Sequence, residues 1–378
     1  MVLFAQKMVK VSQVQVTKYS LLVEALKNEI LGGKYHLNKP FPSIRALIRR
    51  FNLSDTTVQR ALDELFHQGL ISRKQGRGTF ITSNVASRKI GLIVPGVANS
   101  EFFPKLVGEI SRFLGDREYT LIYEDINADG KRLSWDVVYR SVMRLIAENV
   151  SGVLFHPFPD EGGKINQRVM ALLSSARIPV VSLSRNVEGV LDKKCIDCVG
   201  IDNIGAGRQV GEYLIGCGCK RIAFLLYPDV TTVRDRMWGL LISVQGTPVR
   251  FKSYKTRLDD ARTIKMMMAS FHPHAIVCGN DELAVAVKRS LDELKICVPE
   301  DVKLLGFDDI RYAQSMVPQL TSVRQPCTEI ALTAVNRLIE RIKTPDLPQM
   351  SMRLQAEIIV RGSTSSKTKS QKSKRQTT

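Results

Sequence analysis

Residues 54–81 read SDTTVQRALDELFHQGLISRKQGRGTFI, and their pattern decides the fold of the first part of the chain. Between Val58 and Leu65, apolar residues recur at i, i+3, i+4 and i+7, which is the spacing of a helix with one apolar face. Ser54 is a suitable N-cap, and Gly69 stands where the end of a helix needs a residue that accepts a positive φ. The pattern therefore predicts a helix with both ends specified.

A basic β-hairpin is predicted directly after this helix. Residues 70–73 and 79–82 form two short strand-like runs around the tip KQGRG at residues 74–78. The two glycines of the tip allow a tight turn and a close approach to another backbone. Three cations lie at or beside the tip, so this hairpin is suited to an anionic partner.

Two more helices precede this segment. Residues 43–51, SIRALIRRF, follow two prolines and end at Asn52, and residues 18–31 carry apolar residues four apart and stop before two glycines. Two short helices joined by three or four residues form a helix-turn-helix. Three helices followed by a hairpin predict a winged helix-turn-helix.

The phrases PSIRALI, SDTTVQRAL and QGRGTF occur here in order, and in this respect the chain resembles the GntR-type winged-helix domain. The resemblance covers about 65 residues and implies binding to double-stranded DNA. Asp55 and Gln59 stand where that family often has Arg; Gln can pair with adenine and Asp repels phosphate, so no operator sequence is predicted. The residues expected to contact DNA are Arg45, Ser54, Thr56, Thr57, Gln59, Arg60, Lys74, Gln75, Gly76, Arg77 and Gly78.

The distribution of charge supports this interpretation. The chain has 378 residues and a formal net charge of +18. Residues 1–88 carry 14 Lys and Arg against five Asp and Glu, residues 89–362 carry 36 against 32, and residues 363–378 carry five against none. Half of the excess lies in the first 88 residues, as expected if neutralising phosphates supplies much of the affinity. A basic surface that only aids solubility is the alternative. The polar, basic tail 363–378 is expected to be disordered.

From residue 89 the pattern changes to compact apolar runs that alternate with amphipathic stretches. Examples of the runs are 90–95, 120–125, 152–158 and 178–184, and further runs follow at 221–227, 275–280 and 302–309. Strands that alternate with helices predict an α/β fold with parallel sheets covered on both faces. In such folds ligands bind beyond the carboxyl ends of the strands.

Nine phrases in order, among them NSEFFPKLVGEI, VGIDNIGAG, AIVCGNDELAVA and LLGFDD, resemble the effector-binding domain of the LacI family, a relative of the periplasmic sugar-binding proteins. That family implies two lobes joined by three crossovers, with the effector in the cleft between them. A GntR-type reader joined to a LacI-type sensor resembles the AraR-like regulators. The expected domains are 1–82 for the winged helix, 83–88 for the linker, 89–362 for the sensor and 363–378 for the tail. The expected lobes are 89–185 with 311–325, and 186–310 with 326–362.

A polyhydroxylated ligand needs planar polar groups for its hydroxyls and an aromatic face for its C–H patches. Asp202 and Asn203 are expected to organise a turn and cap a helix that starts near Gly205. Phe102 is expected in the core, and Trp238 suits packing as well as a sugar. By motif, the residues expected to contact the effector are Phe103, His156, Arg185, Arg236, Asn280, Asp281, Asp308 and Gln325.

The cysteines invite a metal hypothesis, because Cys195, Cys198, Cys217 and Cys219 lie within 25 residues. Zinc ribbons need paired knuckles at a suitable spacing, whereas here a strand and a helix separate the pairs. We expect no metal and no cofactor, and reduced thiols in a cytoplasmic protein. No signal segment and no membrane-spanning run of about 20 apolar residues is seen.

Three classes of protein can be weighed. An enzyme is not expected, because the chain has no phosphate loop, no G-x-S-x-G elbow, no H-E-x-x-H and no dinucleotide fingerprint. A DNA-binding protein with a ligand-blind sensor that serves only dimerisation remains as an alternative. We expect a transcriptional regulator, by default a repressor, in which a homodimer binds an inverted-repeat operator and responds to a sugar or a sugar derivative.

Overall fold

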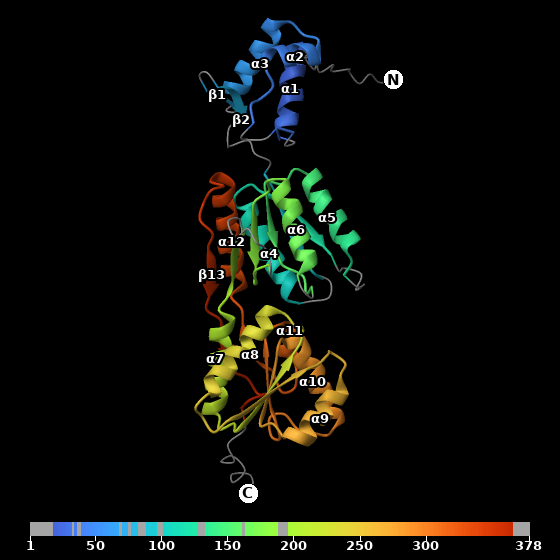
Figure 1. Ribbon diagram of the computed structural model, residues 1–378, viewed down its shortest axis with the longest axis vertical. Helices are drawn as coiled ribbons and strands as arrows, with labels where there is room; N and C mark the ends of the chain where they lie inside the picture. Colours follow the sequence, from blue (N-terminus) through green and yellow to red (C-terminus); the bar gives the residue numbers. More distant parts are fainter. Residues whose placement is uncertain are drawn as a thin grey trace, which may run out of the picture. The chain divides into compact units, whose positions relative to one another are not determined.

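The structure is a computed structural model, and Figure 1 shows its elements. It describes residues 18–31, 34–35, 39–67, 70–74, 77–81, 88–96, 101–126, 133–160, 163–187 and 196–365. The chain divides into two compact units, and the boundary falls between Arg88 and Lys89. Most of the expected linker, and the residues Gly69, Gln75, Gly76 and Cys195, lie outside the described residues.

The first unit is a winged helix-turn-helix, as predicted. Its two strands pair antiparallel, with Ile71 opposite Ile81 and Lys74 opposite Gly78. One apolar cluster, which includes Leu26 of the first helix, unites all five elements. The elements are α1 (Lys18–Leu31), α2 (Ile44–Phe51), α3 (Asp55–His67), β1 (Ile71–Lys74) and β2 (Gly78–Ile81).

Local hydrogen bonds set the ends of α2 and α3. The Ser43 hydroxyl accepts from the Ala46 N–H at 3.3 Å, and α2 ends at Asn52 in a left-handed conformation with a φ of 52°. The Ser54 hydroxyl accepts from the Thr57 N–H at 3.3 Å, which is the capping role expected for it. Short polar caps satisfy N–H groups that a helix start leaves without acceptors.

The second unit contains two six-stranded sheets, each flanked by helices (Figure 1). In the first lobe the strand order is β13-β7-β6-β5-β3-β4, with every pair parallel. Its strands are β3 (Lys89–Val94), β4 (Thr120–Asp125), β5 (Gly152–Phe155), β6 (Val180–Leu183), β7 (Ile196–Ile201) and β13 (Ser351–Leu354). Its helices are α4 (Phe102–Gly115), α5 (Trp135–Ala147), α6 (Lys164–Ser175) and α12 (Cys327–Lys343).

In the second lobe the strand order is β14-β12-β11-β10-β8-β9. Only the β12–β14 pair of this sheet is antiparallel. Its strands are β8 (Arg221–Leu226), β9 (Arg250–Lys255), β10 (Ala275–Cys278), β11 (Lys303–Phe307), β12 (Thr321–Arg324) and β14 (Glu357–Ile359). Its helices are α7 (Asn203–Gly216), α8 (Thr231–Val244), α9 (Ala261–Phe271), α10 (Asp281–Glu293) and α11 (Arg311–Ser315).

The chain crosses between the lobes three times, between β7 and α7, between β12 and α12, and between β13 and β14. This number agrees with the LacI-type resemblance, but the expected lobe limits were wrong. Strand β7 belongs to the first sheet, β12 belongs to the second, and α12 packs on α4 and β5 of the first lobe. Both lobes are built from the same strand–helix units, so local patterning does not tell to which lobe a given unit belongs.

Buried charges attach α12 to the first lobe. The fully buried Asp197 carboxylate on β7 accepts from the Arg341 Nε at 2.6 Å, and the Arg337 Nε lies 2.9 Å from it. The Met350 N–H donates to the same carboxylate at 2.7 Å. Burial alone would raise the pKa of Asp197, but the hydrogen bonds from these groups outweigh burial and lower it.

The expected start of the disordered tail was also wrong. Ser363 and Thr364 are buried, and their hydroxyls bond to the Leu304 carbonyl at 2.6 Å and to the Tyr213 hydroxyl at 2.7 Å. Small hydroxyl side chains can be buried when each finds a partner, which composition alone does not indicate. Residues 366–378 lie outside the described residues.

Candidate functional site

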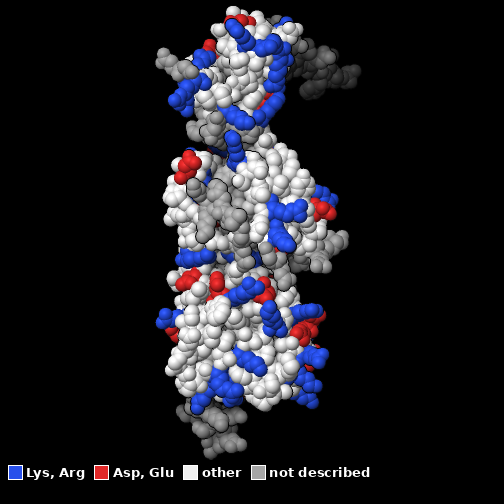
Figure 2. All heavy atoms as spheres, viewed as in Figure 1, with Lys and Arg blue, Asp and Glu red and all other residues white. Residues whose placement is uncertain are grey.

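The described residues among the expected DNA contacts lie on the surface of the winged-helix unit. Arg45 on α2 and Thr56, Gln59 and Arg60 on α3 are exposed, and Thr57 is half-buried. Figure 2 shows Lys and Arg spread over the visible face of this unit, whereas charges of both signs mix on the α/β unit. The expected DNA contacts on α2 and α3 are therefore accessible on the surface of a basic unit.

Several of these side chains have partners inside the unit. The Gln59 Nε2 donates to the Asp55 Oδ2 at 2.9 Å, and the Ser54 and Thr57 hydroxyls lie 2.8 Å apart. The Arg60 guanidinium stacks over the Tyr19 ring at 4.7 Å. These contacts are weak and exposed, so DNA groups can replace them at small cost.

The wing carries exposed cations. Arg77 and Gly78 are exposed, with Gly78 at a φ of 101°, and the Lys74 ammonium lies 5.4 Å from the Phe80 ring. The Arg73 Nη2 pairs with the Asp63 Oδ1 of α3 at 2.5 Å. Sequence reasoning missed this pair, which holds the wing against α3.

In the second lobe, a buried polar network surrounds the Arg236 guanidinium. Its Nε donates to the Asn203 Oδ1 at 2.9 Å, and its Nη1 donates to the Gly279 carbonyl at 2.7 Å. Its Nη2 lies 3.5 Å from the Asp308 Oδ1, which also accepts from the Gln325 Nε2 at 2.5 Å. Three predicted effector residues are therefore brought together from α8, from the end of β11 and from a crossover.

The electrostatics of this network follow from burial. Burial lowers the pKa of Arg236, and the Asp308 and Asp281 carboxylates oppose that shift. The guanidinium also lies 4.5 Å from the Phe307 ring, a favourable cation–π arrangement. Because an arginine keeps its charge under such conditions, the network offers fixed donors and a fixed carboxylate to a ligand.

Asn280 and Asp281, both expected to contact an effector, also have partners within the protein. The Asn280 Oδ1 accepts from the Leu283 N–H at 3.0 Å as the N-cap of α10. Asp281 is fully buried, and its carboxylate accepts from the Ser322 hydroxyl at 2.7 Å and from the Ile310 N–H at 3.0 Å. Asp281 is placed to support the turn at Asp308 rather than to reach a ligand.

In the first lobe, the predicted residues form a separate group. The Phe103 ring on α4 meets the His156 ring edge to face, with centroids 4.9 Å apart. Burial and the nearby Arg185 lower the pKa of His156 to about 3, so its imidazole is neutral at physiological pH. The buried Arg185 donates from Nη2 to the Pro157 carbonyl. This group supplies apolar faces beside polar edges.

Asn203 is a member of the candidate site that the sequence analysis did not name as an effector contact. Asp202 is the N-cap expected, since it accepts from the Gly205 N–H at 2.9 Å, but α7 starts at Asn203 and buries that side chain against Arg236. Asn203 could have been found from its position just after the end of a strand, which is the feature that identified Asp308. Trp238 is half exposed on α8, and Phe102 is partly buried against the core.

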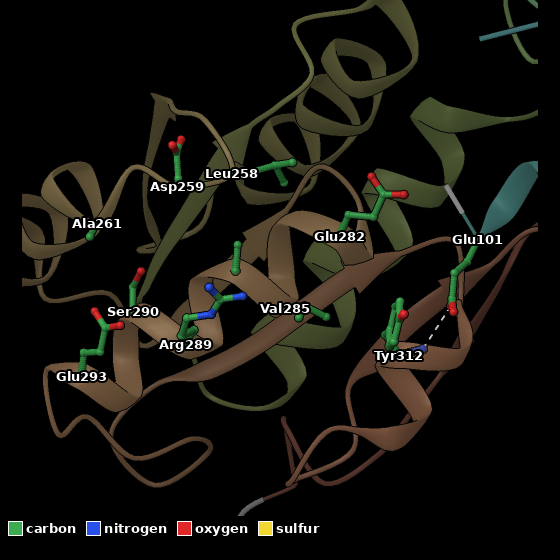
Figure 3. A pocket seen from close by; sticks show the side chains of 11 residues that line it. Glu101, Leu258, Asp259, Ala261, Glu282, Val285, Arg289, Ser290, Glu293 and Tyr312 are labelled. Carbon is green, nitrogen blue, oxygen red and sulfur yellow. Dashed lines mark hydrogen bonds between the residues drawn. The ribbon is translucent and has the colours of Figure 1, made fainter. Parts of the chain in front are cut away.

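Two pockets lie beside these groups, and neither is lined by Arg236, Asp308 or Phe103 in the part of the chain that the structure describes. The larger, of about 690 Å³, is lined mainly by α10 and by acidic side chains, with Glu101 and Tyr312 at one end (Figure 3). The smaller, of about 340 Å³, is lined by Arg185 and Asn166 of the first lobe and by Thr231 of the second.

The described cysteines give no indication of a metal centre. Cys198 and Cys219 are buried and Cys217 is exposed, each as a free thiol. Among the residues that the structure describes, no group of three or more His, Cys, Asp or Glu is arranged to hold a metal ion. Likewise, none of the described helices is long and apolar enough to cross a membrane.

Comparison with known proteins defines the class. Residues 18–81 match the bacterial regulatory proteins of the gntR family, and residues 212–364 match the periplasmic binding protein-like domain. The chain therefore joins a gntR-family domain to a periplasmic binding protein-like domain, and this combination is that of a DNA-binding transcriptional regulator.

Individual relatives match the whole chain or most of it. The chain is 28% identical to the arabinose metabolism transcriptional repressor of Geobacillus stearothermophilus, over 92% of this chain and 97% of that one. It is 28% identical to the ribose operon repressor of Escherichia coli K12, over 72% and 81%. A LacI-type regulator from Alkaliphilus metalliredigens, solved with D-xylulofuranose, has a TM-score of 0.62 and is 21% identical. The similarity covers 74% of this chain and 100% of that one, and it shows that the two share a fold. These relatives are regulators and not enzymes, in agreement with the sequence-based expectation.

Proposed function

We propose that the protein is a cytoplasmic repressor of sugar-utilisation genes that releases its operator when a small sugar or sugar derivative binds between the lobes. The observation that carries this proposal is the network of Arg236, Asn203, Asp308 and Gln325, which presents planar donors and acceptors at strand ends and crossovers. Adjacent sugar hydroxyls need such bidentate, pre-oriented partners. The neutral His156 and the Phe103 ring offer a face for the C–H side of the ring.

The similarity to arabinose and ribose repressors favours a pentose as the first ligand to test. Residues of both lobes would contact the sugar, so binding would favour one arrangement of the lobes over another. A coupling of about 1–3 kcal/mol between effector and operator would suffice for regulation.

The DNA-binding half of the proposal uses α3 and the wing. Thr56, Thr57 and Gln59 would face base edges, and Arg45, Lys74 and Arg77 would neutralise phosphates. Two copies would bind an inverted repeat, since a two-fold dimer matches a palindromic site. Large apolar side chains on the second lobe, such as Leu258, Met266 and Val317, are exposed and support a dimer held through the sensor.

A thermal-shift screen of the purified protein against pentoses, hexoses, sugar phosphates, sugar acids and purines tests the effector. A ligand at 100 times its Kd adds about 2.7 kcal/mol to the folded state. A hit should be lost in Arg236→Ala and kept in Arg208→Ala. Arg208 is a matched control, because it is an exposed arginine that pairs with Glu212 at 2.7 Å on the surface of α7.

Operator binding, measured by fluorescence anisotropy on DNA selected from a random library, tests the other half. Thr57→Ala should weaken operator binding and leave the ligand-induced thermal shift unchanged. Arg236→Ala should abolish the thermal shift and leave operator binding unchanged. A protein that binds its operator but responds to no ligand would favour a sensor that serves only dimerisation, and sedimentation would then show the dimer.

A further inference from the structure

Glu101 makes a hydrogen bond that joins the two lobes. It occupies the N-cap position of α4 in the first lobe, yet within the described residues its side chain makes no capping hydrogen bond to its own helix. Its Oε2 accepts instead from the Tyr312 N–H of α11 in the second lobe at 3.1 Å (Figure 3). Side chains that cap from this position, such as Asp and Ser, bond to the N–H groups of their own helix, whereas the Glu101 carboxylate bonds to the other lobe.

The Tyr312 N–H requires an acceptor from outside its own helix. Tyr312 is the second residue of α11, and the first N–H groups of a helix have no acceptor within that helix. Since the donor is a backbone group, the bond forms whatever side chain stands at position 312. A charged acceptor makes the hydrogen bond stronger than a neutral one.

Both ends of the bond are tied to the candidate effector site. Glu101 precedes Phe103 by two residues, and Tyr312 follows Asp308 by four. The start of α11 is fixed to its own lobe, because the buried Asp281 accepts from the Ile310 N–H at 3.0 Å. We call the first-lobe group around Phe103 and the second-lobe network around Asp308 the two walls of the effector cleft. Moving Glu101 away from Tyr312 would therefore separate these two walls.

We propose that the Glu101–Tyr312 hydrogen bond is a latch that holds the two walls of the effector cleft together before the effector binds. Its consequence for effector affinity rests on the proposed function, whereas its existence does not. Glu101 and Tyr312 also line one end of the 690 Å³ pocket, so solvent reaches the latch. A partly exposed hydrogen bond of this kind corresponds to about a threefold to tenfold change in an equilibrium constant.

The first experiment needs no ligand and measures hydrogen exchange of the Tyr312 amide in the full-length protein. Glu101→Ala should accelerate exchange at Tyr312 about threefold to tenfold. Glu101→Gln keeps an oxygen acceptor and should restore part of the protection. Glu109→Ala is the matched control, because Glu109 lies on the same helix and pairs with Arg112 at 2.6 Å; it should leave Tyr312 unchanged.

The second experiment measures the Kd of the sugar identified with the wild-type protein. Glu101→Ala should raise this Kd about threefold to tenfold and shift operator release to higher sugar concentration. Operator affinity without the sugar should stay at the wild-type value or become tighter. Glu101→Gln should lie between the wild type and Glu101→Ala, and Glu109→Ala should match the wild type.

The outcomes separate the two proposals. Unchanged exchange at Tyr312 in Glu101→Ala, or equal effects of Glu101→Ala and Glu109→Ala, would overturn the latch. Faster exchange with an unchanged sugar Kd would also overturn it, since the bond would then not act on the cleft. If no sugar binds the wild type, the proposed effector fails, and the exchange result alone decides whether the lobes are joined at this point.

Discussion

The two candidate binding surfaces are built in opposite ways. In the winged helix, residues such as Arg45, Thr56 and Arg77 are exposed. In the sensor, Arg236, Asn203 and Gln325 are buried and bonded to one another or to Asp308. DNA is a large partner that brings a rigid charged surface, so exposed side chains suffice. A small ligand gains affinity only from groups that are already held in place.

In the winged helix, binding affinity and folding stability therefore depend on different residues. In the sensor, both depend on the same residues. A substitution on the DNA surface should change affinity with little change in the free energy of unfolding. A substitution in the effector network should change both, because each group there is also a partner of another buried group.

The largest effect is expected for Arg236→Ala. The change removes the cation that faces Asp308 and one hydrogen bond of Asn203, and removing one member of a buried ion pair costs about 3–5 kcal/mol. Urea unfolding of the sensor should show this loss, and the sugar response should disappear. Arg208→Ala should stay within about 0.5 kcal/mol of the wild type. An unchanged unfolding free energy in Arg236→Ala would mean that the network is not preformed.

The next effect concerns His156 and pH. Burial and Arg185 lower its pKa to about 3, whereas an unfolded histidine takes up a proton near pH 6.5. The unfolded state therefore binds more protons between these values, so the contribution is complete above pH 6.5 and declines as the pH falls. From pH 7.5 to pH 5 the wild type should lose up to about 2 kcal/mol more than His156→Gln.

Urea unfolding at both pH values measures this difference. His67→Gln is the control, because His67 lies exposed at the end of α3, and it should behave like the wild type. Parallel losses in the wild type and in His156→Gln would show that the folded state does not hold the His156 imidazole in its neutral form.

A smaller effect is expected at Glu29, which lies at the centre of a charge cluster in the winged helix. Burial alone would raise the pKa of Glu29, but hydrogen bonds from Arg50, Lys34 and Tyr35 outweigh it and lower the pKa to about 2. The resulting stability is present above pH 4.5 and is lost as the pH falls toward 2. Glu29→Gln should cost about 1–2 kcal/mol at pH 7, since Arg50 and Lys34 are partly exposed.

Denaturation of Glu29→Gln at pH 7 and pH 2.5, beside Glu24→Gln as an exposed control on α1, checks this value. Operator affinity should not change, because Glu29 is not among the candidate DNA contacts. A loss of operator binding in folded Glu29→Gln would show that the comparison between the two surfaces is too simple.

The smallest effect is expected for Arg77→Ala at the wing tip. Operator affinity should fall about fivefold near 0.15 M salt, and the slope of log K against log salt should become shallower by about 0.9, as for one lost phosphate contact. The unfolding free energy should not change. Anisotropy titrations at several salt concentrations measure both quantities, with Arg112→Ala in the α/β unit as the control that should keep the wild-type slope.

Some elements could be predicted closely because their causes are local. The limits of α2 and α3 follow from Ser43, Asn52 and Ser54, whose capping hydrogen bonds and left-handed backbone depend on neighbours within a few residues. The strand runs at β3, β5 and β11 were visible because a buried parallel strand is apolar on both faces.

The candidate effector site was predicted in part. Arg236, Asp308 and Gln325 were named from motif and strand-end position, and the structure brings them together. Asp281 was named on the same grounds but is fully buried beneath that turn. Adjacent residues at a strand end point to opposite sides, and only their packing partners show which one faces a ligand.

The sequence by itself determined the winged helix, the alternation of strands and helices, and the class of protein, because periodicity, caps and motif order are properties of short segments. Only the tertiary structure decided the lobe to which β7, β12 and α12 belong, the pairing of Asn203 with Arg236, and the bond from Glu101 to Tyr312. The last two of these contacts join residues 33 and 211 positions apart. Long-range contacts depend on how complete elements pack, and no local pattern carries that information.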